Sequence, residues 1–170
     1  MKIRNSKIIL IINLIVYMLF LLPIRKLNMF TENYSTLSLD TRGYLYLLFL
    51  GIIIGLLLAY ETYFINGKMM AILMFFSLVL GTIIPHHVPY DIQGNMHLLF
   101  AYIGFAGMMS ITYMNLLKQS NQYLINMYFL SFFEFGFIYM QYGMVTTVLE
   151  IVIMSMVMMF NYLVYKKKCA

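Results

Sequence analysis

The side chains best suited to chemistry gather in one short stretch of this 170-residue sequence. All three histidines, His86, His87 and His97, occur in it, and Asp91 lies between them. Neutral imidazole and carboxylate groups are ligands that suit zinc. Their spacing matches no specific metal motif, and adjacent histidines rarely ligate one ion together. A zinc site formed by His86, His87 and His97 is therefore one hypothesis, and ordinary hydrogen bonding in a loop is the other.

Two further carboxylates, Glu134 and Glu150, fall within long apolar runs. An ionisable group inside a membrane span is costly, so it is a functional hypothesis by default. The alternative is structural, since each carboxylate could instead hydrogen-bond to a neighbouring helix. Which reading applies depends on the elements that position these groups.

The composition predicts a membrane protein. The chain is 63% hydrophobic and 10% charged, whereas a soluble domain carries about 25% charged residues. Apolar runs repeat along the whole length, which predicts a single integral membrane domain over residues 1–170. The net charge of +5 does not indicate a nucleic-acid partner, because the basic residues cluster at the termini and in short loops, as beside a membrane surface.

We expect an all-α bundle of six transmembrane helices. Asp40 or Thr41 is the expected N-cap of the second helix, and Asn95 that of the fourth. The first apolar run ends at Pro23 with no small-x-small cleavage site after it, which favours an uncleaved helix over a signal peptide. The expected spans cover residues 8–22, 44–60, 69–84, 96–117, 123–140 and 144–165.

Basic residues predict the orientation. One side of a six-span bundle collects eight of them, and the other side collects Arg25, Lys26 and Arg42. The positive-inside rule then puts both termini in the cytoplasm and the histidine loop outside the cytoplasmic membrane. The eight residues are Lys2, Arg4, Lys7, Lys68, Lys118, Lys166, Lys167 and Lys168.

This arrangement predicts a cavity in the outer leaflet. Glu134 and Glu150 would lie at similar depth on neighbouring antiparallel helices. His97 begins a helical stripe that continues through Ala101, Gly104, Met108 and Asn115 and should face the bundle. The expected binding residues are His97, Glu134 and Glu150, with Asp91 and Arg42 contributed by the outer loops.

Small residues recur on one face of the second span. Gly51, Gly55 and Ala59 follow one another at intervals of four. Such a pattern lets two membrane helices approach closely. It predicts tight packing, either within the chain or in a homodimer.

Two segments resemble the bacterial domain-of-unknown-function family 998. The first is YSTLSLDTRGYLYLLFLGIIIGLLL, a Ser-rich segment before a Gly-containing helix. The second is GTIIPHHVPYDIQGNMHLLFAYIGFAGM, in which Gly81, Pro85, Asp91 and His97 match the family's centre. The paired His86–His87 and the long loop depart from it. The resemblance implies a six-span membrane protein, remotely similar to Frag-like proteins, and implies no activity.

Three functions follow as hypotheses. The first is a non-catalytic membrane protein that binds a lipid or other amphiphile in the outer cavity. The second is a metal-dependent lipid hydrolase, in which the histidines hold zinc and a glutamate moves protons. The third is a small proton-coupled transporter with Glu134 and Glu150 as its relay.

Overall fold

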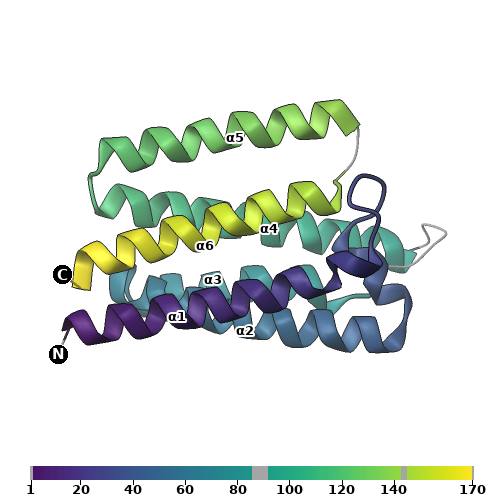
Figure 1. Ribbon diagram of the computed structural model, residues 1–170, viewed down its shortest axis with the longest axis horizontal. Coiled ribbons are helices and arrows are strands. Elements are labelled where there is room, and N and C mark those ends of the chain that lie inside the picture. The colour runs from purple at the N-terminus through teal and green to yellow at the C-terminus, as the bar shows by residue number, and fades with distance from the viewer. Residues whose placement is uncertain (1, 86–91, 143–144, 170) are drawn as a thin grey trace.

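The computed structural model describes residues 2–85, 92–142 and 145–169, and this part of the chain is helical without a strand (Figure 1). The all-α prediction is confirmed at this level. His86, His87 and Asp91 lie outside the described residues. The elements are α1 (Lys2–Leu21), η1 (Leu22–Lys26), η2 (Tyr34–Leu39), α2 (Thr41–Asn66), α3 (Lys68–Ile83), α4 (Ile92–Lys118), α5 (Gln122–Tyr142) and α6 (Thr147–Cys169), where η marks a 3₁₀ helix.

Five stretches among the described residues are long and apolar enough to cross a membrane: α1 with η1, α2, α4, α5 and α6. The shorter apolar helix α3 has 16 residues. It rises about 24 Å, against about 30 Å for the hydrocarbon core of a bilayer. The bundle is thus compatible with an integral membrane protein, and a sixth span through α3 stays a prediction.

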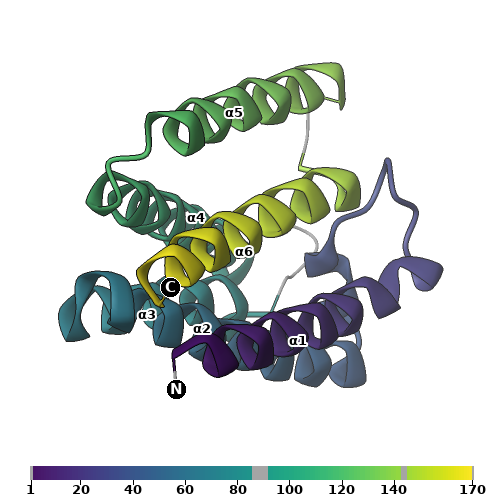
Figure 2. The ribbon, with the colours of Figure 1, turned by 60° about the vertical axis from the view of Figure 1, so that its left-hand side comes forward.

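Helix α6 forms the centre of the bundle. It packs against α1, α2, α4 and α5, whereas α3 packs against α2 and α4. Figure 2 shows α6 between α1 on one side and α4 and α5 on the other. Both termini lie at one end of the bundle, and η2 lies at the opposite end (Figure 1).

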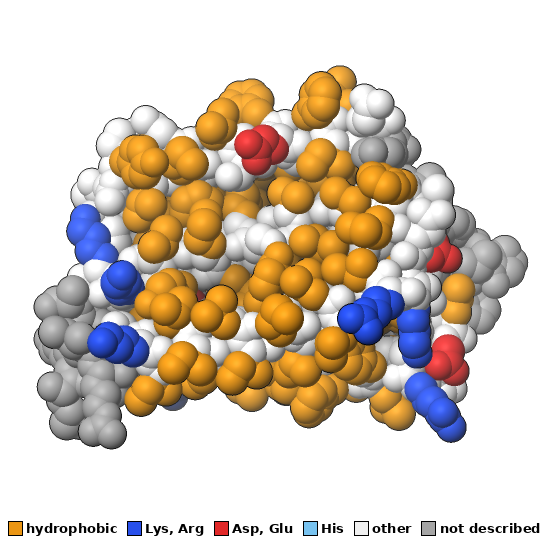
Figure 3. Space-filling model, viewed as in Figure 1, with side chains coloured by type: hydrophobic (Ala, Val, Ile, Leu, Met, Phe, Trp, Pro, Cys, Tyr) orange, Lys and Arg blue, Asp and Glu red, His pale blue; other side chains and the backbone are white. Residues whose placement is uncertain are grey.

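The outer surface is apolar. Figure 3 shows hydrophobic side chains across the middle of one face, with Lys and Arg side chains toward its two ends. Large apolar side chains are exposed on the outer helices, among them Leu14 and Met18 of α1, Leu56 of α2 and Phe133 of α5. An exposed apolar surface of this extent indicates contact with lipid rather than water.

Two predicted helix starts have different outcomes. The carboxylate of Asp40 accepts from the backbone N–H of Gly43 at 3.3 Å, which confirms Asp40 as the N-cap of α2. The prediction that Asn95 caps the fourth helix is wrong, because α4 already begins at Ile92.

Helix α2 is longer than expected. The expected spans leave residues 61–68 as a connection between the second and third spans, and this is wrong, because α2 continues to Asn66. The polar residues that indicated a loop are buried instead, with Glu61 and Thr62 both 0% exposed. Only Gly67, at φ +90°, separates α2 from α3. This conformation favours glycine because it has no Cβ.

Glycines bring α2, α3 and α4 close together. A Cβ at Gly104 would lie 2.2 Å from the Ser77 carbonyl oxygen, and one at Gly51 would lie 2.7 Å from Thr82 Oγ1. Gly55 faces the ring of Phe75 in the same way. The small-residue face of α2 therefore packs within the chain, against α3. A homodimer through Gly51, Gly55 and Ala59 stays a prediction, and it would require α3 to move away.

Candidate ligand-binding cavity

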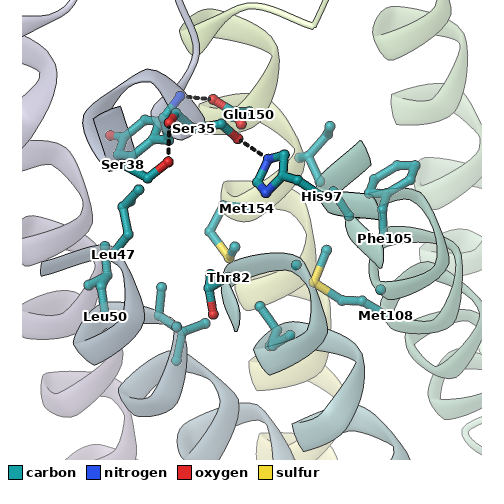
Figure 4. A pocket seen from close by; sticks show the side chains of 18 of the residues that line it. Ser35, Ser38, Leu47, Leu50, Thr82, His97, Phe105, Met108, Glu150 and Met154 are labelled. Carbon is teal, nitrogen blue, oxygen red and sulfur yellow. Dashed lines mark hydrogen bonds between the residues drawn. The ribbon is translucent and has the colours of Figure 1, made fainter. Parts of the chain in front are cut away.

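A cavity of about 240 Å³ lies at the end of the bundle opposite the termini. Its walls come from η2, α2, α3, α4 and α6 (Figure 4). Polar side chains line one part of it: Ser35, Ser38, His97 and Glu150. Thr82 lies apart from these, among the apolar side chains. Apolar side chains line the remainder, among them Leu47, Leu50, Phe105, Met108 and Met154. The cavity is therefore amphipathic.

His97 links three elements around the cavity. It is 5% exposed, and its Nδ1 lies 2.6 Å from the carbonyl oxygen of Ile84, directly after α3. Because a carbonyl only accepts, Nδ1 carries the proton. Nε2 lies 3.1 Å from the hydroxyl oxygen of Ser35 in η2. In the neutral ring Nε2 is an acceptor, so Ser35 donates to it.

Glu150 holds the η2 segment against α6. It lies in the first turn of α6, and its Oε2 accepts from the backbone N–H of Tyr34 at 2.6 Å. The backbone N–H groups of Thr147 and Val148 donate to the carbonyls of Glu32, at 2.7 Å, and Met29, at 3.2 Å. The start of α6 thus obtains partners for donors that no helical carbonyl can reach. As a result, the segment before η2 is fixed against α6, and η2, which follows it, forms a wall of the cavity.

Tyr34 anchors the same segment to α1. Its ring stacks on Phe20 with centroids 4.4 Å apart, and its hydroxyl donates to the Phe20 carbonyl at 2.5 Å. Burial, and next to it the charge of Glu150, raises the pKa of the Tyr34 hydroxyl above its ordinary value. The hydroxyl therefore remains a neutral donor.

The electrostatics of the cavity come from a single acidic group. Among the described residues that line it, Glu150 is the one carboxylate, and no Lys or Arg is present. This lining suits a neutral or positively charged polar group better than a phosphate or sulfate, which binds where cations or several donors converge.

The structure brings together some of the predicted site residues and separates others. His97 and Glu150 line the same cavity. Glu134 is exposed on α5 and does not line it, whereas we expected it to line the cavity together with Glu150. Arg42 is exposed in the first turn of α2 and also lies outside the cavity lining. The described residues contain no group of three or more His, Cys, Asp or Glu side chains placed to hold a metal ion.

The stripe predicted along α4 is confirmed. His97, Gly104, Met108 and Asn115 are buried, and Ala101 lines the cavity. The two ends of this stripe make different contacts. His97 contacts η2, and Asn115 belongs to a polar network nearer the termini.

That network was not predicted. Asn115 Nδ2 donates to Thr62 Oγ1 at 3.0 Å and to Asn161 Oδ1 at 2.6 Å. Asn161 Nδ2 in turn donates to Thr112 Oγ1 at 2.9 Å. Asn66 at the end of α2 donates to Asn115 Oδ1. The sequence signal was available, because these polar residues lie inside apolar helical runs at spacings of three and four.

Comparisons with known proteins add no relative. No protein-family model matches the chain, and the comparisons with curated proteins and with solved structures gave no match either.

Proposed function

We propose that this chain is a non-catalytic, multi-pass protein of the cytoplasmic membrane that binds one amphiphile in the cavity. The observation that carries the proposal is the division of the cavity lining into a polar part, with Ser38, His97 and Glu150, and an apolar part, with Leu50 and Met108. Ligand pockets combine apolar walls with a few placed polar groups in this way.

The size of the cavity limits the ligand. Its volume of about 240 Å³ lies just below the range of about 300–1,000 Å³ found for pockets that hold drug-sized molecules. One chain with a small head group fits this space better than a whole two-chain phospholipid. The absence of Lys and Arg from the described lining favours a head group that is neutral or positively charged.

The proposal includes six spans with both termini in the cytoplasm. Three observations support it. The two termini lie at the same end of the bundle (Figure 1). Lys166, Lys167 and Lys168 lie in the last turn of α6. Lys168 Nζ donates to the Ile65 carbonyl at 2.8 Å, so a cation also caps α2 at that end. The cavity would then open toward the outer leaflet.

Membership of domain-of-unknown-function family 998 is part of the same proposal. Its support is local: the Ser-rich segment on which the resemblance rests forms η2, and Ser35 and Ser38 line the cavity. The hydrolase and transporter hypotheses stay alternatives. No group in the described part of the chain favours a metal site over the amphiphile.

Photolabelling tests amphiphile binding. The purified full chain in lipid nanodiscs is irradiated with a long-chain alcohol that carries a diazirine, and the labelled peptides are mapped by mass spectrometry. We expect labels on the cavity side of α4 and α6, near Met108 and Met154, competed by unlabelled alcohol.

A matched pair of variants provides the control. Ala101 lines the cavity, whereas Ala106 on the same helix is exposed and does not. Ala101→Leu should reduce the competed labelling several-fold, and Ala106→Leu should leave it unchanged. Equal labelling of both variants, or labels confined to the outer surface, would contradict the proposal.

A further inference from the structure

A second polar site lies between α1 and α2, apart from the cavity. Glu61 is 0% exposed and Asn13 is 7% exposed. Asn13 Nδ2 donates to Glu61 Oε1 at 2.7 Å and to the Ile9 carbonyl at 3.0 Å. Because both amide hydrogens have acceptors, the orientation of the Asn13 side chain is determined.

Two oxygen atoms of this pair have no partner. Glu61 Oε2 and Asn13 Oδ1 are buried and make no hydrogen bond to any described group. A buried carboxylate without compensation is among the most costly arrangements in a protein, and it is normally neutralised or paired. Here the donation from Asn13 supplies one hydrogen bond and no positive charge.

The surrounding charges do not compensate Glu61. On α6, Tyr162 is close enough for an electrostatic interaction with Glu61, and its hydroxyl lies 3.4 Å from the Ser6 carbonyl oxygen. The Lys168 ammonium of α6 donates a hydrogen bond to the Ile65 carbonyl. Lys7 of α1 is exposed. A positive charge at Glu61 must therefore come from outside these side chains.

We propose that Glu61 and Asn13 form a binding site for one small monovalent cation, a proton or a sodium ion. The unpaired atoms are oxygens, which hard cations prefer. A divalent ion such as calcium takes about 6–8 oxygen ligands, more than this pair offers. A proton on Glu61 Oε2 needs the fewest ligands, and sodium would use Oε2 together with Asn13 Oδ1.

Glu61 lies toward the end of the bundle that holds the termini. Glu61 lies five residues before the end of α2 at Asn66, which is about 7.5 Å along the helix axis. It does not line the amphiphile cavity. Cation binding here is therefore independent of the function proposed above.

Infrared spectroscopy of the full chain in nanodiscs tests the site, because a protonated carboxyl and a carboxylate absorb at different frequencies. Spectra are recorded at neutral pH in sodium chloride and in choline chloride. A bound proton predicts a protonated-carboxyl band in both salts. Bound sodium predicts a band that is present in choline and lost in sodium. In either case Glu61→Gln should remove the part of the band that Glu61 contributes. Asp40→Asn, which changes an exposed carboxylate at the N-cap of α2, should retain it.

Asn13→Leu gives a second readout if Glu61→Gln does not fold. It removes the hydrogen bond to Oε1, so the Glu61 band should shift while its intensity stays. The proposal is overturned if Glu61 gives only a carboxylate signal that is the same in sodium and choline. It is also overturned if neither Glu61→Gln nor Asn13→Leu alters a protonated-carboxyl band.

Discussion

Asn115 donates its side-chain amide to Asn161 at 2.6 Å, in a contact between α4 and α6 where both residues are 0% exposed. The same two residues also bond to Thr62 and Thr112, so three helices share one hydrogen-bonded network. In an apolar environment an amide has few alternative partners, so this contact specifies which helix faces pack together.

We expect Asn161→Leu to destabilise the bundle. The change leaves donors or acceptors of Asn115 and Thr112 buried without partners, which costs roughly 1–3 kcal/mol for each such group. Unfolding of the purified protein in mixed detergent measures the loss. Asn126→Leu is the control, because Asn126 is exposed on α5. A similar loss in both variants would contradict a role for the network.

Gly104→Ala should loosen the α3–α4 contact. The new Cβ would meet the Ser77 backbone oxygen at 2.2 Å, so one helix must shift, and such overpacking costs about 1–3 kcal/mol. Gly136→Ala on α5 is the matched control, since its Cβ would meet nothing within 4 Å. That variant should be neutral or gain up to about 1 kcal/mol, because alanine favours a helix over glycine. The two melting temperatures should thus move apart.

Ser35→Ala and His97→Asn should give non-additive effects. Each removes the contact between Ser35 and His97 Nε2, while an asparagine amide keeps a donor near the Ile84 carbonyl. The double variant should therefore lose less stability than the sum, by about 0.5–1.5 kcal/mol. Additive losses would show that the contact does not stabilise the cavity wall.

Tyr34 should make stability depend on alkaline pH. Its pKa in the folded protein is raised above the ordinary value, which is about 10 in an unfolded chain. Its contribution is therefore complete below a pH of about 10 and is lost as the pH rises toward the folded-state value. Tyr34→Phe should lower stability at neutral pH and flatten the alkaline decline. Tyr123→Phe, at an exposed tyrosine of α5, should change neither.

Apolar run length was a good guide to where helices form and a poor guide to where they end. α1 ends close to its predicted limit because Pro23 follows it. α2 was underestimated because Glu61, Thr62 and Asn66 look like loop residues in one dimension. They can lie inside a helix because Asn13 of α1 donates to Glu61. Asn115 of α4 donates to Thr62 and accepts from Asn66. Such partners cannot be read from a local window.

The cavity was predicted in part for the same reason. Helical periodicity placed His97 on the inner face of α4, and the short turn expected between the fifth and sixth spans placed Glu134 and Glu150 at similar depth. Periodicity does not determine the rotation of a helix about its own axis or its distance from neighbouring helices. In the structure Glu134 lies on the exposed side of α5. The contribution of Ser35 and Ser38 depends on η2 folding back over α6, a long-range contact without a local signal.

The central place of α6 has a consequence for the order of assembly. α6 leaves the ribosome after the other five helices, yet α1, α2, α4 and α5 all pack against it. Until it is inserted, Asn115 lacks Asn161, and the segment before η2 lacks the α6 backbone donors that hold it. The earlier helices therefore keep these polar groups unpaired until α6 packs against them. A chain that stops before residue 147 would expose those groups to lipid and to membrane proteases.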